Sequence, residues 1–178
     1  IAVHVVDRRQ VRRTGFPYYL GDTAFMHVLR RSFPGERNEE RTVQFLDVAT
    51  RQLAPIPLEG SDERRVVDLA WSPRGELLID RESDDAIHRW LHVVTPGGAP
   101  REVWHDVRTT RIYNDIASTW HPDGRRIVIT GDLDDRYRLY AITPGDTDPQ
   151  PLTPAGSDVT GKAIANAPTR SLYYLSTD

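Results

Sequence analysis

The chain has 178 residues, of which 38% are hydrophobic and 28% charged, a composition typical of a folded globular domain and too apolar for a disordered chain. Its net charge of −3 argues against nucleic acid as a partner, because such binding draws on a strongly basic surface. The absence of cysteine excludes disulfides, thiolate metal sites and a cysteine nucleophile, and no apolar stretch approaches the roughly 20 residues that a membrane-spanning helix needs.

Thirteen prolines and twelve glycines are spread along the chain, and this spacing of turn residues predicts an all-β protein with little helix. The first predicted unit covers residues 1–58, with strands at 1–7, 42–48 and 53–56. These correspond to the second, third and fourth strands of a four-stranded sheet. Residues 8–41 form an insertion that is longer than a usual connection, and we expect a functional or packing excursion there.

An internal repeat defines the next two units, at residues 64–106 and 112–154. Each begins with a strand that ends in Trp, and a turn with Pro and Gly follows. A second strand, an Asp-rich turn, a third strand ending in Thr-Pro-Gly and a short fourth strand complete a repeat of about 45 residues. We expect each Trp to pack between neighbouring sheets. The matching positions are Trp71, Pro73 and Gly75 in one unit and Trp120, Pro122 and Gly124 in the other.

The last unit, at residues 159–178, holds only a first strand at 162–166 and a second at 171–175. The predicted fold is therefore a single, partial β-propeller domain over residues 1–178, with about three and a half four-stranded antiparallel blades. We expect the chain to start and stop inside blades, and any targeting segment to lie outside it. Because unpaired strand edges invite pairing, we also expect marginal stability alone or a homo-oligomer formed through open blade edges.

Two segments carry a resemblance to a known family. Residues 1–7 form a strand that ends in Asp7, and Phe33-Pro34-Gly35-Glu36-Arg37-Asn38 follows after the insertion. With the successive blades, these segments resemble the N-terminal β-propeller of dipeptidyl peptidase IV-like enzymes, in the prolyl oligopeptidase group of serine peptidases. The resemblance implies a substrate-gating and docking scaffold, with an α/β-hydrolase domain of the same parent protein and a peptide substrate as partners. It also implies a periplasmic or secreted location, although the residues themselves leave the compartment open.

The chain departs from this family at two places. In the family a Glu-Glu pair grips the free amino terminus of the substrate, and the only adjacent pair here, Glu39-Glu40, lies in the wrong part of the chain. The role is therefore not transferred. The turn before one third strand also differs, since residues 131–136 replace the family's usual sequence there.

No catalytic residue is predicted in this chain. A serine hydrolase of this group needs Gly-x-Ser-x-Gly at a strand-to-helix turn, and the 178 residues contain no such motif. The segments Gly60-Ser61-Asp62 and Gly156-Ser157-Asp158 are predicted loops, in which Ser and Asp serve turns. If the parent is a peptidase, its nucleophile lies in another part of that protein.

No cofactor and no metal ligand are predicted either. His88 and His92 would lie on one face of a strand but roughly 13 Å apart, too far to share a metal ion, so a structural role is expected. Asp132, Asp134 and Asp135 could suggest calcium, but the surrounding sequence lacks the Gly and Glu of a calcium loop, and a solvated hairpin turn is favoured. The remaining histidines are at positions 4, 27, 105 and 121.

The insertion carries aromatic and basic residues that could line a pocket or contact a partner domain, or could instead cover the edge of a blade. They are Phe16, Tyr18, Tyr19 and Phe25, near Arg12, Arg13 and Arg30. Lys162 is the only lysine, and this strong preference for Arg indicates a GC-rich bacterial genome.

An alternative function also fits the repeat. Blades with this Trp-x-Pro-x-Gly turn are common in TolB-like propellers, which serve as protein–protein interaction platforms, and a fold alone does not decide function. The reading frame beyond Asp178 separates the two hypotheses, because a Gly-x-Ser-x-Gly with a later Asp and His would support the peptidase.

Overall fold

The computed structural model describes residues 1–33, 35–59, 64–109, 116–156 and 158–177, and every regular element within them is a β-strand. The predicted start of the third repeat unit, at residue 112, and the serines at 61 and 157 lie outside these residues. The chain divides into two compact units, Ile1–Arg65 and Val66–Asp178.

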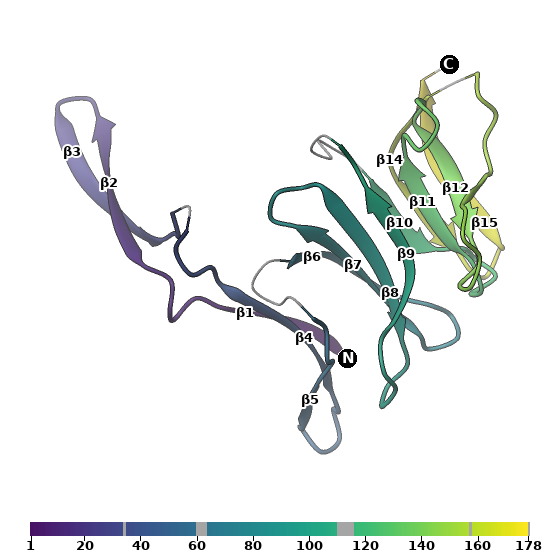
Figure 1. Cartoon of the computed structure of the whole chain (residues 1–178), viewed down its shortest axis with the longest axis horizontal. Helices are drawn as coiled ribbons and strands as arrows, with labels where there is room; N and C mark the ends of the chain where they lie inside the picture. Colours follow the sequence, from purple (N-terminus) through teal and green to yellow (C-terminus); the bar gives the residue numbers. More distant parts are fainter. Residues whose placement is uncertain (34, 60–63, 110–115, 157, 178) are drawn as a thin grey trace. The chain divides into compact units, whose positions relative to one another are not determined.

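The first unit contains a three-stranded antiparallel sheet in the order β1-β4-β5, formed by β1 (Ala2–Asp7), β4 (Glu40–Leu46) and β5 (Leu53–Pro55). The predicted insertion contains an antiparallel hairpin of β2 (Arg13–Leu20) and β3 (Thr23–Arg30), which extends away from this sheet (Figure 1). Gly21 in the connecting turn has a φ of 58°, a conformation that glycine adopts without strain. The sequence pattern did not reveal this hairpin.

The second unit contains the two predicted four-stranded antiparallel sheets, in the orders β6-β7-β8-β9 and β10-β11-β12-β13, followed by the two-stranded sheet β14-β15 (Figure 1). The strand β14 begins earlier than predicted, at Asp158, and its pairing with β15 shifts register between Thr160 and Ile164. The remaining bounds are β6 (Arg64–Trp71), β7 (Leu77–Ser83), β8 (His88–Val94), β9 (Arg101–Val107), β10 (Ala117–Trp120), β11 (Ile127–Gly131), β12 (Arg138–Ile142), β13 (Gln150–Pro151), β14 (Asp158–Asn166) and β15 (Ser171–Thr177).

The turns after the two repeated tryptophans form as predicted. Gly75 and Gly124 have φ values of 83° and 65°, in the left-handed region where glycine is favoured. In the first of these turns the hydroxyl of Ser72 accepts hydrogen bonds from the backbone N–H groups of Arg74 and Glu76, at 3.1 and 3.0 Å. The side chain of Ser72 therefore stabilises the turn that Pro73 and Gly75 predicted.

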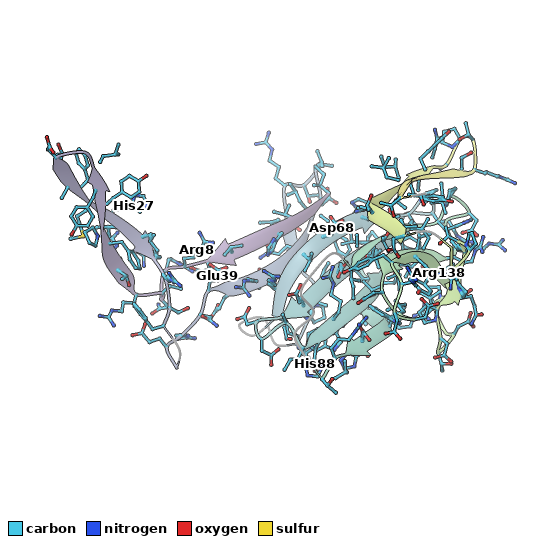
Figure 2. The ribbon with its side chains drawn as sticks, turned by 90° about the horizontal axis from the view of Figure 1, so that it is seen from above. Arg8, His27, Glu39, Asp68, His88 and Arg138 are labelled. Carbon is cyan, nitrogen blue, oxygen red and sulfur yellow. The ribbon has the colours of Figure 1, made fainter. Side chains whose placement is uncertain are left out.

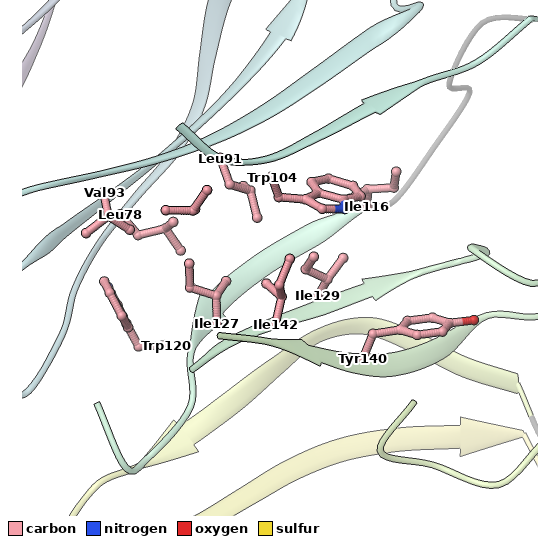
Figure 3. Packing of buried hydrophobic residues seen from close by; sticks show 11 residues of the cluster. Leu78, Leu91, Val93, Trp104, Ile116, Trp120, Ile127, Ile129, Tyr140 and Ile142 are labelled. Carbon is pink, nitrogen blue, oxygen red and sulfur yellow. The ribbon is translucent and has the colours of Figure 1, made fainter. Parts of the chain in front are cut away.

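Apolar side chains of the two four-stranded sheets interlock in one core, which Figure 3 shows from close by. Trp120 is 3% exposed within it, and its indole N–H donates to the carbonyl oxygen of Ala70 at 3.0 Å, so it links two neighbouring sheets as predicted. Trp71 differs, because 43% of it is exposed. Its indole borders an open groove instead of a closed sheet-to-sheet interface. The core residues are Leu78, Leu91, Val93, Val103, Trp104, Ile116, Trp120, Ile127, Ile129, Tyr140 and Ile142.

A second, smaller cluster lies between the sheet β10–β13 and the pair β14–β15. Val128 and Leu139 pack there with Val159 and Ala163, and Leu172 covers them. The sheet β10–β13 therefore has an apolar cluster on each of its faces, and this explains why β11 is buried along its whole length.

A buried ionic cluster also joins the sheets β6–β9 and β10–β13. The guanidinium of Arg89 donates to both carboxylate oxygens of Asp80, at 2.6 and 3.0 Å, and to Glu82 at 3.1 Å. It also donates to the carbonyl oxygen of Ile116 at 2.6 Å, and the hydroxyl of Ser118 donates to Asp80 at 2.6 Å. Burial raises the pKa of Asp80, against the opposing effect of Arg89.

Candidate functional site

A groove that could receive a ligand lies along three successive inner strands, β6, β10 and β14. Its volume is about 700 Å³, within the range of small-molecule and peptide sites. The repeated turns form two of its walls through Pro73 and Pro122, and the small side chains Ala163 and Ala165 of β14 line the third. The half-exposed indole of Trp71 borders the groove, so its surface is largely apolar.

Charged groups lie at the groove and are paired. The ammonium of Lys162, in β14, forms an ion pair with the carboxylate of Asp68, in β6, and so links the first and third of these inner strands. His121 contacts the carboxylate of Asp123 through Nδ1, at 2.9 Å. Burial opposes ionisation of Asp123, but hydrogen bonds from the backbone and side chain of Arg126 and from the backbone of Arg125 outweigh it and hold its pKa well below the usual range. The groove thus combines a largely apolar lining with charged groups that are already paired.

The acidic turn between β11 and β12 has its oxygens in contact with other side chains. Asp134 accepts hydrogen bonds from the hydroxyl of Tyr140 and from Arg138, the latter at 2.6 Å. The Tyr140 contact and then Arg138 lower the pKa of Asp134, and burial together with Asp134 raises the pKa of Tyr140 to about 12. Asp132 accepts from Arg108 at 3.1 Å. Hydrogen bonds from Arg108, Arg138 and Tyr140 therefore hold this turn in place.

The histidines are distributed over several elements. His88 and His92 lie on β8 as predicted, and His92 is buried with its Nε2 atom 4.0 Å from Glu102. His88 has a close neighbour that the sequence spacing did not reveal, since its Nδ1 atom lies 3.1 Å from Nε2 of His105 on β9. Within the residues that the structure describes, no group of three or more His, Asp or Glu side chains could hold a metal ion.

The hairpin β2–β3 displays large apolar side chains. Tyr19 is 74% exposed and Met26 65%, and the predicted contact residues Tyr18 and Phe25 are also exposed. Arg30 folds back to donate to the carbonyl oxygens of Arg8, Arg9 and Val11, at 3.0 to 3.1 Å, and so fixes the base of the hairpin. Contact with a partner and cover for a blade edge both remain predictions for this segment.

Glu40 is the first residue of β4 and Glu39 immediately precedes it, and both are paired with arginines. Glu39 forms ion pairs with Arg8 and Arg41, and Figure 2 shows Arg8 beside it. Glu40 pairs with Arg37 at 3.2 Å. These contacts close the base of the hairpin insertion. Among the described residues, no helix is long and apolar enough to cross a membrane.

In comparisons with known proteins, one family model matches the chain over its whole length. The family model described as the dipeptidyl peptidase IV (DPP IV) N-terminal region matches residues 1–178. No curated protein matches the chain.

Solved structures share its fold at low sequence identity. Dipeptidyl peptidase 4 from Porphyromonas gingivalis is 17% identical, with a TM-score of 0.78 over 98% of this chain and 25% of that one. A putative dipeptidyl aminopeptidase IV from Bacteroides ovatus ATCC 8483 is 14% identical, with a TM-score of 0.67 over 99% of this chain and 24% of that one. The chain therefore spans about a quarter of the length of these structures.

TolB from Acinetobacter baumannii reaches a TM-score of only 0.33 over 75% of the chain, at 16% identity, and this likeness carries no weight for the fold. The sheets described above, together with the two dipeptidyl peptidase structures, confirm the predicted all-β propeller fold.

Proposed function

The chain belongs to the family of dipeptidyl peptidase IV N-terminal regions, and from this premise we propose that it is the non-catalytic propeller part of a dipeptidyl peptidase-like serine exopeptidase. Its role is to dock onto an α/β-hydrolase domain of the same parent protein and to limit which peptides reach the catalytic serine. The family match over all 178 residues, in a sequence that has no Gly-x-Ser-x-Gly, is the observation that carries this proposal.

The exposed hairpin supports the docking role. An apolar surface of this kind costs free energy in water, and contiguous exposed apolar side chains mark interaction sites. Tyr19 and Met26 would be covered by the hydrolase domain, while Arg30 holds the hairpin base in place. The hairpin is built on paired backbone, so it can present these side chains without first having to fold.

The groove at the inner strands supports the gating role. Inner strands of a propeller line its central channel, so side chains at their ends meet a peptide that passes through it. The small residues Ala163 and Ala165 leave room for such a chain, and the prolines of the two repeated turns keep the walls rigid.

Docking can be tested by producing residues 1–178 and the remainder of the parent protein as separate polypeptides. We expect the two to elute together in size-exclusion chromatography as a 1:1 complex. A Tyr19→Ser/Met26→Ser double variant should weaken this complex, whereas Tyr173→Ser, which removes an exposed tyrosine outside the hairpin, should not. Two folded polypeptides that elute separately would contradict the docking role.

Gating can be tested in the full-length parent protein with a bulky substitution at the groove. Ile164 is exposed and lines the groove, so Ile164→Trp should raise the KM for peptides of ten or more residues and leave that for a chromogenic dipeptide substrate unchanged. Leu175→Trp is the matched control, because Leu175 is equally exposed but lies outside the groove. Equal effects of both variants on both substrates would refute gating at this groove.

A further inference from the structure

Two histidines on neighbouring strands form a close pair. His88 and Trp90 are two residues apart on β8 and so share one face of the sheet, and Trp90 lies opposite His105 on β9. This arrangement places Nδ1 of His88 and Nε2 of His105 3.1 Å apart. His105 is exposed and His88 is partly exposed, so solvent reaches the pair, and Figure 2 labels His88.

The indole of Trp90 accompanies both imidazoles. Its ring centroid lies 5.3 Å from that of His88 and 5.1 Å from that of His105, with interplanar angles of 10° and 18°. Trp90 is only 6% exposed, so its position is fixed by the sheet. The pair therefore rests beside a rigid aromatic surface of a kind that attracts cations.

The charge around the pair also favours a cation. Asp85, in the turn that precedes His88, lies close enough to interact electrostatically with it. Hydrogen bonds from Ser83 and from the backbone N–H of Ile87 lower the pKa of Asp85, so its carboxylate is ionised at neutral pH. A negative charge thus stands beside His88.

The separation of the two nitrogens matches a chelate. Imidazole nitrogen binds zinc at about 2.0–2.1 Å, so two nitrogens on one ion at angles of about 90–110° lie roughly 2.9–3.4 Å apart. The observed 3.1 Å falls inside this interval. The ring of His105 is exposed and can turn so that the facing nitrogens of both histidines point at one ion.

We propose that His88 and His105 bind one divalent late transition-metal ion, Cu(II), Ni(II) or Zn(II), with water at the remaining positions. Imidazole ligands suit these ions, whereas Mg²⁺ and Ca²⁺ require oxygen ligands. The described residues provide no third His, Asp or Glu ligand, and the site is therefore an open one to which an added ligand can also bind. It is independent of the proposed docking and gating roles.

The test is isothermal titration calorimetry, in which NiSO₄ is added to the full chain without an affinity tag. We expect one equivalent to bind, His88→Gln and His105→Gln each to weaken binding by about tenfold or more, and MgCl₂ to give no signal. His27→Gln is the matched control, since His27 is exposed on the hairpin and belongs to neither strand. His4→Gln serves as a second control for binding near the amino terminus.

Tryptophan fluorescence during a titration with CuCl₂ gives a second readout that does not depend on the calorimeter. Bound Cu(II) should quench the fluorescence, and Trp90→Phe should reduce this quenching while one Cu(II) ion still binds per chain. Absence of saturable binding in the wild-type chain, or equal binding by wild type, His88→Gln and His105→Gln, would overturn the proposal.

Discussion

Removal of Arg89 should destabilise the protein more than loss of any other charged side chain described here. Its guanidinium contacts the carboxylates of both Asp80 and Glu82 inside the interface, and the side chains of Arg89, Asp80 and Glu82 are only 4%, 1% and 6% exposed. The substitution Arg89→Met keeps the bulk of the side chain but leaves two neighbouring carboxylates buried without that charge.

The expected loss follows from the geometry of this cluster. Breaking a buried ion pair by removing one partner costs about 3–5 kcal/mol, because the other charge is left uncompensated in a low-dielectric interior. For a chain of this size a change of 1 kcal/mol moves the melting temperature by about 2–4 °C, so the melting temperature should fall by about 6–20 °C. Four lost hydrogen bonds, two to Asp80, one to Glu82 and one to the carbonyl oxygen of Ile116, are part of the same total.

The assay is chemical and thermal unfolding, followed by circular dichroism and tryptophan fluorescence. Arg9→Met is the matched control, because Arg9 pairs with Asp7 while its side chain is 85% exposed, and loss of such a surface pair costs at most about 1 kcal/mol. If Arg89→Met prevents folding, the triple variant Asp80→Leu/Glu82→Met/Arg89→Met should restore it, since an apolar replacement of all three side chains removes their buried charges together. Equal losses in Arg89→Met and Arg9→Met, or no recovery in the triple variant, would refute this reasoning.

Three further predictions test other parts of the structure. Trp120→Ala should lower the free energy of unfolding in urea by about 3–5 kcal/mol, because it leaves a cavity in the core. Trp71→Ala should lower it by about 1 kcal/mol or less, because Trp71 is half-exposed, and equal losses would contradict the assigned core. Gly124→Ala should cost about 1–2 kcal/mol in the same assay, since its φ is +65° and the new Cβ would meet Pro73 and Arg74 at 3.1–3.4 Å, whereas Gly156→Ala should be neutral. Tyr140 should be the last tyrosine to ionise in an ultraviolet titration, because its pKa is raised to about 12. Folding favours its neutral form, so this contribution to stability is fully present below about pH 10 and is lost between about pH 10 and 12; in Asp134→Asn the contribution should be smaller and its loss complete at a lower pH.

The repeated turn residues made much of the fold predictable. Pro and Gly act locally on φ, so the positions of Trp71, Pro73 and Gly75 and their repeats predicted the strand ends and turns without knowledge of tertiary contacts. The alternation of side chains over residues 137–142 likewise predicted the strand β12. By contrast, β2 and β3 were missed. Gly15 and Pro17 interrupt the sequence pattern of β2, and the residues of β3 do not alternate between buried and exposed.

Features that depend on strand register or on sheet stacking could not be predicted. The meeting of His88 with His105 depends on which residues of β8 and β9 face each other, and a register shift between Leu91 and His92 alters that pairing along the strand. Asp80 and Arg89 are charged residues in strands, so an exposed face was the simplest expectation. They are buried because a second sheet covers them, and only the structure shows that neighbour.

Hydrolysis of an Xaa-Pro chromogenic substrate tests the central claim most directly. The purified 178-residue chain and the full-length parent protein are assayed side by side at equal molar concentration. We expect release of chromophore by the full-length protein and none above buffer by the 178-residue chain. Saturable hydrolysis by the 178-residue chain, or a folded full-length protein that cleaves no such substrate, would contradict it.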